Sequence, residues 1–345
     1  MSDQTDQIHK PAITGWDIGG ANIKACRLNS TGHRVALRPF PIWQQRDDLA
    51  RVLAGISNQL GPTPLGAVTI TAELADAFRT KNEGINYVLD AIQQAVPNAS
   101  LKVFGVDGRF HSIAAARERP LLVAAANWMA TAVMIARHFP TCLLVDIGST
   151  TTDIIPIEHG KVIAEGRNDP ERLIHGELLY TGAQRTPVFA VVSQVPLWGE
   201  WCPVAAELFA TVQDVHLLLN HLSPEQCTSP SADGRPVTTE FAAERLARVV
   251  CADAEMLRND EILAIARHVA AEQVHQISRA MTQVVAGSGI KGPVVPVGVG
   301  AFLARAAAAA LGLECLSSDT VFDQAASDAA PAAAVAYLLR ELEDV

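Results

Sequence analysis

Hydrophobic residues in the first 140 positions gather in short runs that alternate with longer amphipathic stretches. The short runs contain many β-branched residues and end at Gly, Asn or Pro, a pattern typical of strands. The longer stretches repeat their apolar residues at helical spacing. We therefore predict strands at 12–20, 21–28, 33–40, 65–71 and 101–106, and helices at 47–60, 85–96 and 120–139.

The same order of patterns returns in the second half of the chain. The run CLLVDIGS (142–149) predicts a strand that ends in a Gly turn, as AITGWDIGG (12–20) does, and Asp146 matches Asp17 at a distance of 129 residues. A repeat of this length is typical of a duplicated domain. Further strands are predicted at 150–157, 161–166, 176–182 and 292–300, and helices at 239–254, 259–286, 301–312 and 331–345.

These patterns predict an α/β protein of two similar lobes. Lobe I is predicted at 12–135 and lobe II at 136–318, and lobe II carries an insertion near 195–236 that is rich in Pro, Ser and Gly. The terminal segment 319–345 is predicted to pack back on lobe I as a helix.

Composition narrows the possible partners. The 345 residues carry a formal net charge of −10 and no long Lys/Arg run, which disfavours nucleic acid and anionic membranes. The polar N-terminus MSDQTDQIHK and the lack of long apolar runs predict neither a signal peptide nor a membrane span, so we expect a cytoplasmic protein. Six scattered cysteines without a C-x-x-C pair predict reduced, mostly buried thiols. No feature of the sequence indicates an oligomeric state.

The two Asp-x-Gly turns carry the clearest chemistry. A Gly turn at a strand end exposes backbone N–H groups and lets a phosphate approach closely, although a single such turn is common without any ligand. Asp17 and Asp146 could hold a divalent metal, for which we predict Mg²⁺, and Lys24 could add positive charge. Two facing loops would clamp a diphosphate. The predicted diphosphate-binding residues are Gly19, Gly20, Asn22, Gly148, Ser149, Thr150 and Thr151.

Other polar residues follow predicted strands or interrupt apolar stretches. Glu73 and Asp76 could share a helix face as general bases, or could simply be the acidic start of a helix. Asn127, beside Trp128 in an apolar helix pattern, is either a structural hydrogen-bonding residue or a ligand-binding one. His216 and His221, five apart, do not share a helix face and are not predicted to bind zinc. The remaining predicted cleft residues are Arg167, Gly182, Arg185, Thr186, Gly298 and Gly300.

Both D-I-G-(G/S) hairpins and the late G-V-G turn resemble motifs of the actin/Hsp70/sugar-kinase superfamily, especially its hydantoinase/oxoprolinase branch. The resemblance implies two ribonuclease-H-like lobes with a central cleft. Several further blocks resemble the tetrahydromethanopterin-linked C1-transfer family, which includes an enzyme of methanofuran biosynthesis. These blocks are TITAELADAF, EGINYVL, AAANWMATA, VDIGSTTTDIIPI, GRNDPERLIHGELLYTGAQRTPV, ADGRPVT and RLARVVCAD.

The resemblance implies a transferase that joins an aminomethyl-furanmethanol diphosphate to the phenol of a glutamyl tyramine, or of tyrosine, with release of diphosphate. Glu73, Asp76 and Asp153 are candidates for the base that accepts the phenol proton, while Lys24 could instead lower the pKa of the phenol. Ala301 follows the late Gly turn where a polar residue would help to hold adenosine, so ATP is not favoured as a ligand. Two alternatives stay open: an ATP-dependent kinase or cyclic-amide hydrolase of the same superfamily, and a nucleotide-sensing scaffold.

Overall fold

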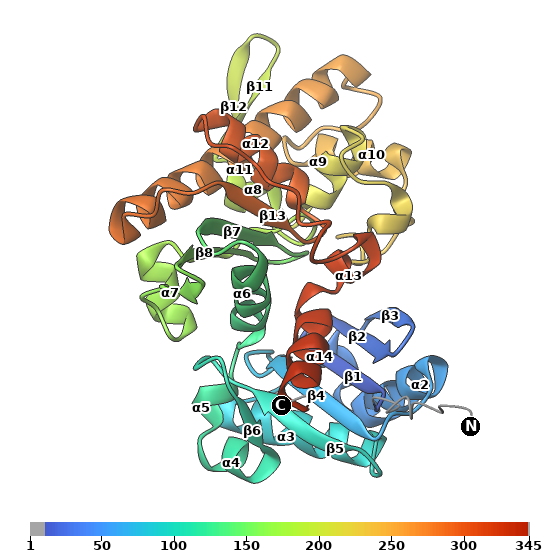
Figure 1. Cartoon of the computed structure of the whole chain (residues 1–345). Coiled ribbons are helices and arrows are strands. Elements are labelled where there is room, and N and C mark those ends of the chain that lie inside the picture. Colours follow the sequence, from blue (N-terminus) through green and yellow to red (C-terminus); the bar gives the residue numbers. More distant parts are fainter. Residues whose placement is uncertain (1–10, 344–345) are drawn as a thin grey trace, which may run out of the picture. The chain divides into compact units, whose positions relative to one another are not determined.

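The structure is a computed structural model that describes residues 11–343. The chain divides into two compact units (Figure 1). Unit 1 contains the chain up to His138 together with the segment from Asp319 onward, and unit 2 is Phe139–Ser318. The polar N-terminal residues 1–10, for which no signal peptide is predicted, and residues 344–345 of the predicted terminal helix lie outside the described residues.

Unit 1 is built on a mixed six-stranded sheet of order β3-β2-β1-β4-β5-β6. Its first three strands form an antiparallel meander, and β4 and β5 continue the sheet parallel to β1. The register places Asp17 opposite Lys24 and beside Thr69. The strands are β1 (Ile13–Gly19), β2 (Asn22–Asn29), β3 (Gly32–Pro39), β4 (Leu65–Thr71), β5 (Ser100–Phe104) and β6 (Phe110–Ser112).

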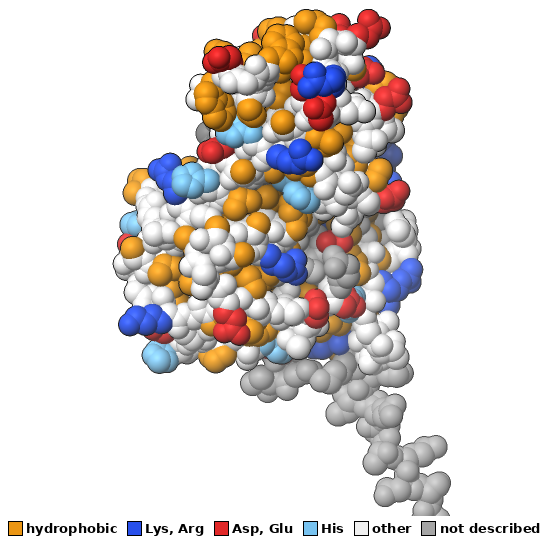
Figure 2. Space-filling model, turned by 90° about the horizontal axis from the view of Figure 1, so that it is seen from above, with side chains coloured by type: hydrophobic (Ala, Val, Ile, Leu, Met, Phe, Trp, Pro, Cys, Tyr) orange, Lys and Arg blue, Asp and Glu red, His pale blue; other side chains and the backbone are white. Residues whose placement is uncertain are grey.

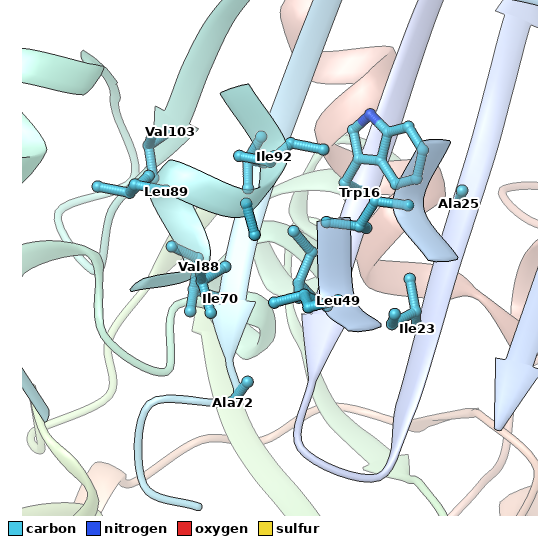
Figure 3. Close-up of a cluster of buried hydrophobic side chains, with 14 of the residues drawn as sticks. Trp16, Ile23, Ala25, Leu49, Ile70, Ala72, Val88, Leu89, Ile92 and Val103 are labelled. Atoms are coloured by element: carbon cyan, nitrogen blue, oxygen red, sulfur yellow. The ribbon is translucent and has the colours of Figure 1, made fainter. Parts of the chain in front are cut away.

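Helices of unit 1 bury the apolar faces of this sheet. Figure 3 shows Trp16, Ile23 and Ile70 of the sheet in one buried cluster with Leu49 and Leu89 of two helices. Helix α14 packs on β1, where a Cβ on Gly15 would lie 2.0 Å from the Ala332 carbonyl oxygen, so only Gly permits this approach. The helices are α1 (Ile42–Gln45), η1 (Arg46–Asp48), α2 (Leu49–Leu60), α3 (Lys81–Ala95), α4 (Ile113–Glu118), α5 (Pro120–Val123), α6 (Asn127–His138), α13 (Gln324–Asp328) and α14 (Ala330–Glu343).

The prediction of one helix over 120–139 is wrong. Helix α5 ends at Val123 and α6 begins at Asn127, because Ala124 forms a parallel bridge with Ile70 at the end of β4. Ala125 then adopts a φ of 48°, which a helix cannot accommodate. Composition hides this break, since residues 124–126 are all Ala, the residue with the highest helix propensity.

Unit 2 repeats the strand–turn–strand start of unit 1. Strands β7 and β8 are antiparallel, with Asp146 opposite Asp153, and β13 lies parallel to β7 on its other side. The sheet order is β10-β8-β7-β13, with β9 also paired to β8. The predicted repeat is therefore confirmed at the level of strand pairing. The strands are β7 (Cys142–Ile147), β8 (Thr152–Glu158), β9 (Lys161–Val162), β10 (Leu178–Leu179) and β13 (Val294–Val297).

The strands predicted at 161–166 and 176–182 are each only two residues long. The predicted insertion holds a hairpin of β11 (Gln194–Leu197) and β12 (Glu200–Pro203), which sequence reasoning missed because its four-residue strands are too short to show alternation. The helices of unit 2 are α7 (Asp169–His175), α8 (Val188–Val191), α9 (Val212–Leu218), η2 (Pro224–Gln226), α10 (Thr239–Arg248), α11 (Asn259–Ser288) and α12 (Ala301–Ala310).

Within the described part of the chain, every helix is too short or too polar to cross a membrane. Basic and acidic side chains are interspersed on the face shown in Figure 2. All six cysteines are free thiols, as predicted, but the prediction that most of them are buried is wrong, since Cys202 and Cys227 are half-buried and Cys251 and Cys315 are exposed. Cys26 and Cys142 are buried, and burial raises the pKa of each thiol to about 12, but Cys251 is exposed, contrary to the apolar pattern around it.

Candidate functional site

The loop between β7 and β8 forms the centre of the unit 2 site. Asp146 is a buried residue near the end of β7. The chain then turns between Gly148 and Thr151, where the Gly148 N–H donates to the Thr151 carbonyl at 3.0 Å. A Cβ on Gly148 would meet only the Thr151 oxygen, at 3.8 Å. The surrounding fold would therefore accept a side chain at Gly148. Because glycine has none, that space stays open to a ligand on one face of the loop.

A second segment, residues 181–186, holds this loop from behind. The Ala183 N–H donates to the Gly148 carbonyl, and the N–H groups of Gln184 and Arg185 both donate to the Ser149 carbonyl at 2.9–3.0 Å. A Cβ on Gly182 would lie 2.6 Å from the backbone nitrogen of Thr150, so Gly182 is required for the contact. The sequence predicted that Gly182 belongs to the site, and the structure places it directly against the loop.

The predicted late glycine turn closes the same site from a third side. Val297 of β13 pairs with Asp146, and a Cβ on Gly298 would lie 2.7 Å from the Asp146 Oδ1 atom. Gly298 has a φ of 86°, which disfavours any other residue. The Gly300 N–H donates to the Ile147 carbonyl at 2.9 Å. Thus three stretches far apart in sequence meet at the loop between β7 and β8, and the Gly298 turn lies against the Asp146 carboxylate.

Arg185 supplies a positive charge at this site, and Thr186 supplies a hydroxyl group. The Arg185 Nη1 atom lies 3.5 Å from the Thr150 Oγ1 atom, and burial lowers the pKa of the guanidinium without making it neutral at physiological pH. The Thr186 Oγ1 atom accepts from the Gly182 N–H at 3.1 Å. Arg185 is therefore placed to bind an anion on the loop, whereas Thr186 holds the backbone of the loop's support.

The donor set around Asp146 fits Mg²⁺ better than a transition metal. Among residues 11–343, no three His, Cys, Asp or Glu side chains converge as a metal cluster. Mg²⁺ needs only one or two carboxylates when substrate phosphates and water complete its octahedral shell. The Asp146 carboxylate, with the space that Gly298 leaves beside it, matches that requirement.

Asp153 has a partner that bears on its predicted role as a base. Arg172, which is 1% exposed, places its Nη1 atom 2.9 Å from the Asp153 Oδ1 atom. The Arg172 Nη2 atom also donates to the Glu177 carbonyl at 2.8 Å. A carboxylate held by a buried guanidinium keeps its charge and is a weak proton acceptor. This geometry favours a structural role for Asp153, and its catalytic assignment stays a prediction.

The matching loop of unit 1 joins β1 to β2. A Cβ on Gly19 would lie 2.8 Å from the Asn22 carbonyl oxygen, whereas a Cβ on Gly20 would have ordinary contacts at 3.7 Å. The Lys24 Nζ atom lies 3.8 Å from the Asp17 Oδ2 atom. Unit 1 therefore places a carboxylate and an ammonium beside its Gly turn. The equivalent positions in unit 2, Asp146 and Asp153, are both carboxylates, and Arg185 adds a guanidinium at the loop.

Glu73 and Asp76 do not share a helix face, contrary to the sequence interpretation. They lie in successive turns after β4, and α3 begins only at Lys81, because the Thr80 side chain caps it by accepting from the Glu83 N–H. Glu73 is 2% exposed, with its Oε1 atom 3.7 Å from the Lys81 Nζ atom. Asp76 is exposed.

Three predicted cleft residues lie outside the unit 2 loop. Asn127 is the first residue of α6 rather than an interior residue, and Trp128 after it is buried. Arg167 is exposed just before α7, where its backbone N–H donates to the Glu171 carboxylate at 2.8 Å. The described contacts of Arg167 tie it to that helix start rather than to the loop.

Sequence reasoning missed two buried glutamines that support the site. Gln184 accepts from the N–H groups of Thr228 and Ser229 and anchors that segment beside the loop. Gln273 lies on α11, and its Nε2 atom contacts the Thr181 Oγ1 atom and the Gly182 carbonyl at 2.8–2.9 Å. A polar residue on the apolar face of α11 was the only available signal for Gln273.

His216 is buried against Gln273, and this position makes the unfolding free energy pH-dependent. Burial lowers the pKa of His216 from 6.5 to about 4. The unfolded chain therefore takes up a proton first as the pH falls below about 6.5, and the associated stability, roughly 3 kcal/mol, is lost by about pH 4. Urea unfolding should show this loss between pH 7 and 4.5 in the wild type, with a smaller loss in His216→Phe. Equal losses in both proteins would contradict the assignment.

Comparison with known proteins places this geometry in a family. The hydantoinase/oxoprolinase family profile matches residues 65–342, which include the loops around Asp146, Gly182 and Gly298. The chain belongs to the hydantoinase/oxoprolinase family. Within this family it is similar to a curated protein of Methanocaldococcus jannaschii named (4-{4-[2-(gamma-L-glutamylamino)ethyl]phenoxymethyl}furan-2-yl)methanamine synthase. The two are 38% identical over 258 residues, which cover 74% of this chain and 77% of the relative.

A second relative with the same synthase name comes from Methanococcus vannielii. It is 38% identical over 125 residues, which are 36% of this chain and 56% of the relative. Among solved structures, this hydantoinase/oxoprolinase-family protein resembles nucleotide-free acetone carboxylase, with a TM-score of 0.53, 10% identity, and coverage of 86% of this chain and 66% of that one. That likeness concerns the fold alone. Together with the strand order of both units, it confirms the predicted ribonuclease-H-like lobes.

Proposed function

We propose that this protein forms the aryl ether bond of a phenoxymethyl-furan methanamine in methanofuran-type cofactor biosynthesis. The observation that carries the proposal is the 38% identity to the Methanocaldococcus jannaschii synthase over three quarters of this chain. The name of that relative describes a furan methanamine joined through a phenoxymethyl group to a gamma-glutamylaminoethyl chain. The reaction proposed here makes that same CH₂–O bond from two small molecules.

The donor is a furan methyl diphosphate, as the phosphate-type loop suggests. The backbone of Gly148–Thr151 and the Arg185 guanidinium would bind the diphosphate oxygens, and Asp146 would hold the Mg²⁺ that goes with them. Bound Mg²⁺ would supply charge neutralisation for the leaving group. The loop N–H groups and Arg185 are fixed before the reaction, so they stabilise the charge that develops on the leaving oxygen without reorganisation.

The acceptor is the phenol of a glutamyl tyramine or of a tyrosine. Its oxygen forms the new bond to the furan CH₂ carbon as the bond from that carbon to the diphosphate oxygen breaks. The phenol proton passes to a base, for which Glu73, Asp76 and Asp153 are candidates, and the electron pair of the broken bond leaves on diphosphate. Asp153 is held by Arg172, and the Glu73 Oε1 atom lies 3.7 Å from the Lys81 Nζ atom, so all three carboxylates stay candidates.

Product analysis tests this proposal. The purified protein is incubated with 5-(aminomethyl)-3-furanmethanol diphosphate, γ-glutamyl tyramine and Mg²⁺, and the products are identified by mass spectrometry. We expect equal amounts of aryl ether and diphosphate, with formation stopped by EDTA and independent of ATP. If the ether fails to form, or if turnover requires ATP, the proposed reaction is incorrect.

A further inference from the structure

A chain of hydrogen bonds connects an exposed histidine to the back of the phosphate-type loop in unit 2. The chain runs from His221 through His216 and Gln273 to Thr181 and Gly182. The Nδ1 atoms of His221 and His216 are 3.2 Å apart, and the His216 Nε2 atom lies 2.8 Å from the Gln273 Oε1 atom. His216 and Gln273 are both 0% exposed, while His221 is at the surface. These hydrogen bonds connect α9 and the turn at its C-terminus, through α11, to the 181–186 segment of the site.

The bonding partners determine the direction of each hydrogen bond. The Gly182 carbonyl can only accept, so the atom of Gln273 that faces it must be the amide nitrogen. The Gln273 oxygen therefore accepts from His216, which must carry its proton on Nε2. The Nδ1 atom of neutral His216 is then an acceptor, and His221 must donate to it. Each link has one donor and one acceptor only in this arrangement.

The last members of the chain touch the loop itself. The Thr181 carbonyl accepts from the Thr152 hydroxyl at 2.7 Å, and Gly182 packs against Thr150 so closely that no Cβ would fit. The Gln273 amide is bonded to the Thr181 hydroxyl and to the Gly182 carbonyl, one on each side of the same peptide unit. Gln273 thereby limits the movement of the segment on which the loop rests.

The histidine pair also contacts the third side of the site. The ring of Phe302 packs edge-on against His216, with centroids 4.9 Å apart, and lies 5.2 Å from the His221 ring. Phe302 is the second residue of α12, and this helix begins directly after Gly300. The Gly300 N–H donates to the Ile147 carbonyl. The buried imidazole of His216, with the exposed ring of His221 beside it, thus contacts both backbone segments that flank the loop.

We propose that His216 and Gln273 are positioning residues that hold the phosphate-type loop in its binding conformation. The proposal rests on the proposed function only in naming diphosphate as the ligand of that loop. Neither side chain reaches the open face of the loop, so each acts through Thr181 and Gly182 rather than on the substrate. Without these bonds the 181–186 segment and the loop would move more freely. Ordering them again would then reduce the free energy of diphosphate binding.

A matched pair of glutamines on α11 tests this proposal. Gln273→Met removes the bonds to the loop support with little change in volume, whereas Gln276→Met removes a bond from the same helix to the Val191 carbonyl. His216→Phe and the exposed His221→Ala provide variants at the other links. Hydrogen exchange of the amides in 148–152 and 182–186 is measured in each protein, with affinity for Mg²⁺-diphosphate measured by calorimetry.

We expect faster exchange in both segments for Gln273→Met and His216→Phe, a smaller effect for His221→Ala, and none for Gln276→Met. Loss of about one to two hydrogen bonds corresponds to roughly tenfold weaker diphosphate binding. In turnover, the KM for the diphosphate substrate should rise while the KM for the phenol stays unchanged, a split that general destabilisation would not produce.

The outcomes separate this proposal from the proposed function. If Gln273→Met and Gln276→Met show the same exchange in these segments, Gln273 has no positioning role and the proposal is overturned. If exchange rises in Gln273→Met and His216→Phe but not in Gln276→Met, and the wild type binds no diphosphate, the positioning role stands and the proposed function fails. Equal increases in the KM of both substrates would also overturn the proposal.

Discussion

Asp146→Asn is expected to lower kcat/KM by roughly 10²–10³-fold and to abolish Mg²⁺-dependent diphosphate binding, while the fold is kept. The amide is close in shape to the carboxylate, and Gly298 leaves the side chain the same space. What changes is the negative charge that would hold the cation against the substrate phosphates. Calorimetric titration with Mg²⁺ and diphosphate, together with steady-state kinetics, measures both effects.

Asp260→Asn is the matched control for this substitution. Asp260 is an exposed carboxylate at the start of α11, paired with Arg258 and outside the loop site. We expect its binding and turnover to equal those of the wild type. Wild-type affinity and turnover in Asp146→Asn would remove Asp146 from the proposed metal site.

Arg245→Met should destabilise unit 2 by about 3–5 kcal/mol, because it breaks a buried ion pair from one side. The Nε and Nη2 atoms of Arg245 lie 2.9 and 2.7 Å from the same oxygen of Asp214, and both side chains are 0% exposed. Burial already raises the pKa of Asp214, and the guanidinium opposes that rise. Without Arg245 the carboxyl must be buried as an uncompensated charge or take up a proton.

Chemical denaturation of Arg245→Met beside Arg258→Met tests this prediction. Arg258 makes its ion pairs at the surface, so its loss should leave the unfolding transition almost unchanged. The double variant Arg245→Met/Asp214→Leu should recover part of the lost stability, since it removes both charges together but leaves the Thr211 N–H at the start of α9 without its Asp214 acceptor. An Arg245→Met protein as stable as the Arg258→Met protein would show that the buried pair contributes little.

Much of the fold was predictable from local patterns. The two Asp-x-Gly hairpins were visible because a buried strand must end abruptly at a Gly turn, and the register confirms that Asp17 and Asp146 occupy equivalent strand positions. The break at Ala125 was not predictable, because it arises from the pairing of the preceding Ala124 with Ile70, a residue far away in sequence. Helical propensity cannot report such a tertiary contact.

The candidate site was predictable in its glycines and less so in its side chains. Gly182 and Gly298 stand out in sequence because close backbone approach tolerates no other residue. The pairing of Asp153 with Arg172, 19 residues apart, depends on where α7 packs and leaves no local pattern. Gln273 lies 91 residues from Gly182 and is recognisable only once α11 is folded over the sheet.

We propose that this protein transfers the furanylmethyl group by breaking the bond between its CH₂ carbon and the diphosphate oxygen. The most direct test uses a furan methyl diphosphate with ¹⁸O in the bridging position between carbon and phosphorus. Mass spectrometry of the products of turnover with the phenol then locates the label. We predict that all of the ¹⁸O leaves in the diphosphate and none appears in the aryl ether. Label retained on the furan carbon, as the free alcohol, would show phosphorus–oxygen cleavage and contradict the account.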